Sequence, residues 1–341
     1  MTEQPTAGPA PAADAGPKPH LDGELAAALA ARGGVPAPLT PDALGEWQRR
    51  DAARRPRPAP HRIADGGRFT VAEHDADGTP LVAARPAGAD GVLPALLHLH
   101  GGGLIGGNAY AVLPRVLREL AQPLGLAVLS VDYPLAPAAR YPAPLHACRT
   151  ALHWAVRHAE RLRIDPARIV LGGKSAGGGL AAALALLLRD EGGPAPLGQL
   201  LLSPMLDDRG TTASTRQAAG HDTWDAVSNA TAWQAALGPL HRAPDLPPYA
   251  APARARDLTD LPPAYLEVGS AETFRDEVTA YANALWQGGG HAELHVWPGA
   301  CHGFDTLAPD AAVSRTAVAA RRDWLRRLLG PGPEPSGRPA Y

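Results

Sequence analysis

The sequence predicts an α/β fold in which helices cover both faces of a mostly parallel central sheet and a helical cap lies over the sheet. Short apolar runs alternate with longer helical segments, a spacing typical of parallel strands joined by crossover helices. Residues 205–262 separate two of these runs, and so long a connection inside a compact domain is either functional or disordered. Its tryptophans, Trp224 and Trp233, favour an ordered cap.

The first elements are predicted to be a tail and two helices. Residues 1–20 are rich in Pro, Ala and Gly, a composition that cannot bury a core, so we expect a disordered tail. Residues 21–60 are predicted to supply the N-terminal cap helices. The first of them covers residues 21–32, and the second begins at the capping pair Thr40 and Pro41.

The core begins with a hairpin and continues with alternating strands and helices. Apolar and polar positions alternate on both sides of Asp77–Gly78, which predicts an antiparallel hairpin over residues 67–87. Six further strands are expected at residues 95–101, 126–133, 168–173, 198–204, 263–271 and 291–299. The predicted helices are 110–122, 145–162, 176–190, 276–288 and 311–329.

This pattern predicts a core in two parts, interrupted by the cap. The predicted divisions are core 61–206, cap insertion 207–250, core 251–330 and a flexible tail at 331–341. The 341 residues carry a net charge of −2, which gives no argument for nucleic-acid binding or for an anionic membrane surface. Two distant cysteines, no secretion signal and no membrane-spanning apolar run predict a cytoplasmic protein.

The segment "LGGKSAGGG" at residues 171–179 fits two motifs, a phosphate-binding loop and a nucleophile elbow. The phosphate-binding loop needs a glycine five residues before Gly173, where the chain has Arg168. The elbow needs an apolar strand before the serine and small residues after it, and both are present. The sequence therefore favours an elbow with Ser175 as the nucleophile.

Reactive side chains follow the carboxyl ends of the predicted strands, where the sites of open α/β sheets lie. Ser175, Glu272 and His302 occur in the chain order serine, acid, histidine. A serine hydroxyl needs a base as it attacks, an imidazole can serve, and a carboxylate orients and stabilises that imidazole. We expect these three residues to form a catalytic triad, with Asp276 as the alternative acid.

The "HGGG" run at residues 100–103 is predicted to bind an oxyanion. Backbone N–H groups of Gly102, Gly103 and Ala176 would stabilise the developing negative charge, and His100 and Gly101 would support the loop. Leu104, Trp224 and Phe274 are weaker candidates for the substrate pocket. His98 and His100 share a strand face, but no acidic residue or cysteine nearby completes a metal site. Neither a metal nor a cofactor is expected.

These motifs resemble the bacterial hormone-sensitive lipase-like family of α/β-hydrolases over about residues 20–330. Besides "HGGG", the chain carries "VDYPLAP", "GKSAGG", "GSAETFRDE" and "CHGF" in that family's order. The resemblance implies the α/β-hydrolase fold and a cap-bearing carboxylesterase for short- to medium-chain acyl esters. It also suggests a homodimer through the last edge strand. The departures are Lys174 in place of an acidic residue, Pro134 in place of arginine, Ala138 in place of glutamate, and Glu272 in place of aspartate.

The same motifs are compatible with functions other than ester hydrolysis. An amidase or an acyltransferase would use the same triad, and a non-catalytic ligand-binding protein would keep the fold, although such proteins typically lose a triad residue. Lys174 is expected to be a solvated charge that points away from the pocket. A sharper hypothesis is that its charge acts on His302.

Overall fold

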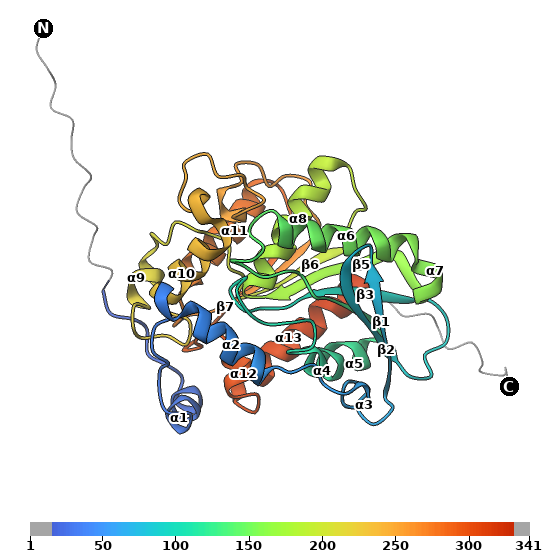
Figure 1. The fold of residues 1–341 in the computed structure, drawn as a ribbon, viewed down its shortest axis with the longest axis horizontal. Coiled ribbons are helices and arrows are strands. Elements are labelled where there is room, and N and C mark those ends of the chain that lie inside the picture. The colour runs from blue at the N-terminus through green and yellow to red at the C-terminus, as the bar shows by residue number, and fades with distance from the viewer. Residues whose placement is uncertain (1–15, 331–341) are drawn as a thin grey trace, which may run out of the picture.

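The computed structural model describes residues 16–330, with an eight-stranded sheet at its centre (Figure 1). The strand order is β1-β2-β4-β3-β5-β6-β7-β8. β2 is antiparallel to β1 and β4, and the other neighbours are parallel, which confirms the mostly parallel sheet. The strands are β1 (Phe69–Ala76), β2 (Thr79–Pro86), β3 (Leu93–Leu99), β4 (Ala127–Val131), β5 (Ile164–Lys174), β6 (Gly198–Leu202), β7 (Ala264–Gly269) and β8 (Ala292–Trp297).

Helices cover both faces of this sheet (Figure 1). Leu97 and Leu171 pack on one face with α6, α8 and α11, while their chain neighbours Leu96 and Val170 pack on the other with α4, η2 and α13. This alternation follows from the two-residue period of a strand. The main helices are α4 (Leu113–Val116), η2 (Leu117–Ala121), α5 (Gln122–Leu124), α6 (Ala143–Arg157), α7 (Ala159–Leu162), α8 (Ala176–Glu191), α11 (Arg275–Gln287), α12 (Phe304–Leu307) and α13 (Ala312–Leu329).

The predicted hairpin is confirmed. Ala76 pairs with Thr79, so Asp77 and Gly78 form a two-residue turn, with φ angles of 51° and 86°. Positive φ at both central residues is what a hairpin turn matching the twist of its strands requires.

The helix predicted over residues 110–122 is broken into α4, a π-helical turn η2 and the short α5. Pro123 explains the break, because proline has no N–H to donate to the carbonyl of Glu119. The Arg322 side chain on α13 donates to this carbonyl at 2.6 Å instead. The carbonyl of Glu119 is therefore hydrogen-bonded by a side chain of a distant helix and not by the next turn of its own helix.

The segment predicted as the cap insertion contains α9 (Ala213–Gln217), α10 (Ala226–Leu237) and the short 3₁₀ turn η3 (Gly238–Leu240). The 3₁₀ turn η4 (Pro252–Arg254) lies just beyond it. Asp225 caps α10 by accepting from the N–H of Ser228 at 2.8 Å. Trp233 is buried, as expected for a packing residue. The exact division between core and cap stays a prediction.

The N-terminal helices α1 (Gly23–Ala31) and α2 (Leu44–Arg54) form close to the predicted positions. A 3₁₀ turn, η1 (Pro41–Ala43), precedes α2, but Thr40 makes no capping hydrogen bond with its side chain. Leu25 of α1 packs in the cluster that contains Cys301 and Phe304. Gln48 of α2 donates to the carbonyl of Ile105 at 2.7 Å. Both helices therefore contact loops that carry predicted site residues.

The predicted tails lie largely outside the described residues, which exclude 1–15 and 331–341. Lys18, which lies within the predicted tail, contacts the segment predicted as the cap insertion. The Lys18 ammonium donates to the carbonyl of His221 at 2.5 Å and lies 3.7 Å from the buried Asp222 carboxylate.

Candidate active site

The turn between β5 and α8 presents Ser175. This residue has φ 58° and ψ −124°, a backbone conformation that is strained for any residue other than glycine. The residues two positions before and after it must be glycine, since a Cβ on Gly173 would lie 2.4 Å from the backbone of Gly177, and one on Gly177 would lie 2.0 Å from the carbonyl oxygen of Leu99. The nucleophile elbow predicted from the sequence thus has the backbone geometry that such a turn needs.

Ser175, His302 and Glu272 form one hydrogen-bonded chain. His302 Nε2 lies 3.0 Å from Ser175 Oγ, and His302 Nδ1 lies 3.1 Å from Glu272 Oε1. The other carboxylate oxygen of Glu272 accepts from Ser203 Oγ at 3.0 Å and from the N–H of Gly269 at 2.9 Å. Because Glu272 can only accept, Nδ1 carries the proton and Nε2 faces the serine as a base.

The "HGGG" loop passes beside this chain. Within residues 16–330, the N–H groups of Gly102, Gly103 and Ala176 donate to no other residue, so they are free to meet a ligand oxygen. His100 Nδ1 donates to the carbonyl of Gly101 at 2.9 Å. Burial lowers the pKa of His100 to about 3, so its imidazole is neutral. His100 is thus hydrogen-bonded to the glycine loop that it was predicted to support.

A family model described as the alpha/beta hydrolase fold matches residues 96–306. The chain belongs to this family. It is 35% identical to esterase LipI of Mycobacterium tuberculosis over 213 residues, which are 62% of this chain. The match spans 65% of LipI, slightly less than two thirds of that relative's length. It is 33% identical to an acetyl-hydrolase of Streptomyces hygroscopicus over 256 residues, 73% of this chain and 80% of the relative.

A solved structure titled bacterial heroin esterase covers 91% of this α/β-hydrolase and 98% of its own chain, with a TM-score of 0.81 and 37% identity. These matches confirm the predicted fold and the resemblance to hormone-sensitive lipase-like hydrolases.

Two other carboxylates near the acid position of this α/β-hydrolase are engaged elsewhere. Asp276 accepts from the N–H of Ser214 at 2.7 Å and pairs with Arg275 at 2.8 Å. Glu277 accepts from the N–H of Leu206 at 2.7 Å. Only Glu272 of these three carboxylates is hydrogen-bonded to His302.

The sequence did not reveal a strap, residues 222–224, that crosses the site. Thr223 Oγ1 donates to the carbonyl of His302 at 2.5 Å, and Asp222 accepts from the N–H of Thr273, beside the predicted acid, at 3.0 Å. Thr273 Oγ1 in turn donates to the carbonyl of Trp224 at 2.6 Å. The strap joins the loop that carries Glu272 to the loop that carries His302. No local motif marks these residues.

The three predicted pocket residues have different positions. The indole of Trp224 covers Gly103 so closely that a Cβ there would lie 2.7 Å from the ring. Leu104 follows with φ 63° and is partly buried. Phe274 is fully buried and meets the His302 ring edge-on, with centroids 5.0 Å apart. Phe274 therefore packs under the imidazole, and it has no exposed surface that could line an open pocket.

His98 and Cys301, neither of them a predicted site residue, are a hydrogen-bonding residue and a packing residue. His98 Nδ1 lies 3.0 Å from Ser130 Oγ, and burial lowers its pKa to about 4. Cys301 is buried, which raises the pKa of its thiol to about 12. Among residues 16–330 no cluster of three His, Cys, Asp or Glu is arranged to hold a metal. No helix in this range could cross a membrane.

The expectation that Lys174 is a solvated charge is wrong. Its side chain is only 19% exposed and pairs with Asp305, whose carboxylate is buried. Lys174 is the last residue of β5, and its side chain reaches Asp305 on the side of the sheet where Arg321 of α13 also pairs with that carboxylate. The ammonium is therefore part of the packing behind the nucleophile.

Proposed function

We propose that this carboxylic ester hydrolase uses Ser175, His302 and Glu272 to hydrolyse short- to medium-chain acyl esters through an acyl-enzyme. The observation that carries the assignment is the hydrogen-bonded chain from Ser175 Oγ through His302 to a fully buried Glu272. A buried carboxylate with three donors is preorganised to stabilise an imidazolium.

The residues act in two half-reactions. Ser175 Oγ attacks the ester carbonyl while His302 Nε2 takes its proton, and the oxyanion is stabilised by the N–H groups of Gly102, Gly103 and Ala176. The imidazolium then gives that proton to the departing alkoxide, which leaves as the alcohol. Water then attacks the acyl-enzyme as His302 takes its proton. The bond from the acyl carbon to Ser175 Oγ breaks, the imidazolium returns the proton to that oxygen, and the carboxylic acid leaves.

The preference for shorter acyl groups is supported by the cap. Trp224 lies directly on Gly103, so it narrows the space beside the predicted oxyanion donors. The name of the Streptomyces relative, acetyl-hydrolase, points to a small acyl group in the same family.

An ester series tests this proposal. The p-nitrophenyl esters from acetate to decanoate are compared in the parent protein and in Ser175→Ala. We expect the highest kcat/KM for the shorter esters, a sharp fall beyond about C8, and loss of turnover in the alanine variant. Turnover that persists in Ser175→Ala would remove the proposed mechanism.

We also propose a homodimer through β8 and a cytoplasmic location. β8 is the last strand of the sheet, and Val296 on it is 39% exposed. An exposed edge strand favours pairing with a second copy. The cytoplasmic location is supported by Cys148 and Cys301, which are both buried free thiols. Fractionation of the source cells tests the location.

A further inference from the structure

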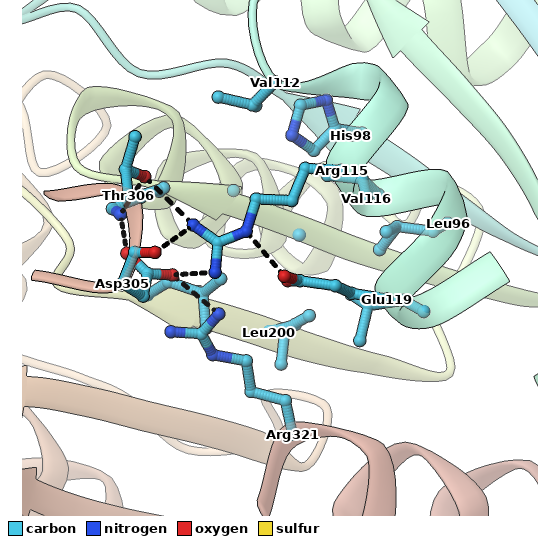
Figure 2. Close-up of a pocket in the computed structure, with 15 residues that line it drawn as sticks. Leu96, His98, Val112, Arg115, Val116, Glu119, Leu200, Asp305, Thr306 and Arg321 are labelled. Carbon is cyan, nitrogen blue, oxygen red and sulfur yellow. Dashed lines mark hydrogen bonds and ion pairs between the residues drawn. The ribbon is translucent and has the colours of Figure 1, made fainter. Parts of the chain in front are cut away.

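A cluster of buried and partly buried charges lies behind the nucleophile, on the face of the sheet covered by α4 and α13. We call it the Asp305 cluster; it comprises Lys174, Asp305, Arg321, Arg115 and Glu267. Figure 2 shows Arg115 and Arg321 reaching Asp305 from separate helices, with Glu119 on the other side of Arg115.

Lys174 and Asp305 connect the two loops that carry the reacting groups. Lys174 directly precedes Ser175, and Asp305 follows His302 by three residues. The Lys174 ammonium contacts Asp305 Oδ1 and also lies 3.2 Å from Thr306 Oγ1. The pair therefore links the end of β5 to the first turn of α12.

Asp305 is a fixed anion. Burial alone would raise the pKa of Asp305, but the charges of Lys174, Arg321 and Arg115 outweigh it and hold the pKa well below its ordinary value. Arg321 Nη1 lies 2.8 Å from Asp305 Oδ2, and Arg321 Nε lies 3.0 Å from Glu267 on β7. This arrangement anchors Asp305 to the centre of the sheet.

Close packing does not fix Lys174 on every side. A cavity of about 50 Å³ borders it, with Leu96, Leu200 and Leu202 among the apolar walls. Packing contacts therefore do not enclose the Lys174 side chain on every side, so its directional ion pair with Asp305 matters more for its position.

We propose that Lys174 is a positioning residue for the ester hydrolysis proposed above. Through Asp305 it sets where the His302 loop lies relative to Ser175. The resemblance leads one to expect an acidic residue at position 174, and the reversed charge here meets a complementary carboxylate. The Ser175–His302 distance of 3.0 Å thus depends on a contact on the opposite side of β5.

Lys174→Met removes the charge and keeps an apolar chain of similar length, while Lys174→Arg keeps the charge. With p-nitrophenyl acetate, we expect Lys174→Met to lower kcat about tenfold or more with KM changed less than about twofold, and Lys174→Arg to restore most of kcat. Arg54→Met, which removes an exposed cation, is the matched control and should behave like the parent.

A double-mutant cycle with Asp305→Asn separates positioning from general loss of stability. If Lys174 acts through Asp305, Lys174→Met should add little to the kcat defect of Asp305→Asn. Should Lys174→Met not fold, Lys174→Gln, which keeps a hydrogen-bond donor, takes its place in every comparison. Parent-like kcat in either folded neutral variant would overturn the inference. The proposed function would still stand if Ser175→Ala is inactive.

Discussion

At the scale of single residues, the environment of each carboxylate decides its role. Glu272 is buried, accepts from Ser203 and Gly269, and reaches His302 with its other oxygen. Asp276 is occupied by Ser214 and Arg275. Burial would raise the pKa of Asp276, but Arg275 and the Ser214 N–H outweigh this and lower it. Asp276 is thus an ionised anchor for the cap segment.

Glu272→Gln and Asp276→Asn should therefore differ sharply. We expect Glu272→Gln to lower kcat about 10³- to 10⁴-fold, because an amide in this place favours the wrong imidazole tautomer. Asp276→Asn should change kcat by less than about threefold, since it loses only an anchoring contact. Steady-state kinetics on one short ester measure both. A larger loss in Asp276→Asn than in Glu272→Gln would reverse the assignment.

The site residues differ in how far the sequence could predict them. Ser175, Glu272 and His302 follow apolar strands, and parallel strands bring their carboxyl ends to one edge of the sheet. The strap contacts could not be predicted in this way. Thr223 and His302 are 79 positions apart, and no local motif contains both residues. The pairing of Lys174 with Asp305 was missed for the same reason.

At the scale of elements, local patterns predicted structure where local forces decide it. The hairpin at Asp77–Gly78 and the β5–α8 elbow were predicted because few residue types tolerate positive φ. The break between α4 and α5 was not predicted: Pro123 removes one donor locally, but the group that satisfies the carbonyl of Glu119 is the Arg322 side chain of the distant helix α13.

The junction between the end of β6 and α11 contains another buried acid, Glu277, whose protonation affects stability. Glu277 on α11 accepts from the N–H groups of Leu206 and Asp207, at 2.7 and 3.3 Å. Burial raises the pKa of Glu277 well above its ordinary value, despite these two hydrogen bonds. Above the unfolded pKa of about 4.3, the folded chain keeps a proton that the unfolded chain releases, so rising pH destabilises the fold through this residue.

Glu277→Gln should remove this dependence. The amide oxygen still accepts from Leu206 and carries no charge at any pH. The quantity compared is the Tm of Glu277→Gln minus the Tm of the parent. We expect this difference to be larger at pH 8 than at pH 5 by about 2 °C or more. Thermal unfolding followed by circular dichroism at both pH values measures this difference. An equal Tm difference at the two pH values would contradict the role given to Glu277.

At the scale of the whole molecule, the order of the strands brings distant segments of the chain together. β5 lies between β3 and β6, with β7 next in the sheet, so Ser175 lies between the glycine loop after β3 and the acid loop after β7. The strap from the cap segment links the acid loop to the loop that carries His302, and the Asp305 cluster links that His302 loop to the end of β5. The reacting groups are held by the tertiary structure and not by any one element.

The same strand order leaves β8 at the edge of the sheet, where within residues 16–330 it pairs only with β7. Two such edges can pair in antiparallel register across a two-fold axis, which would extend the sheet through two copies. Val296 and Trp286, 39% and 46% exposed, lie on β8 and on the neighbouring α11, and would be covered by a partner. We therefore expect the parent to elute as a dimer on size-exclusion chromatography with light scattering.

Val296→Asp places a charge on this edge and should shift the protein toward monomer, since like charges on two facing strands repel. Val92→Asp is the matched control, because Val92 is 59% exposed and precedes β3, away from β8. It should leave the mass unchanged. Because Ser175, Glu272 and His302 all belong to one chain, monomeric Val296→Asp should keep esterase activity within about twofold of the parent. A monomeric parent, or a dimer that Val296→Asp leaves intact, would place any association on another surface.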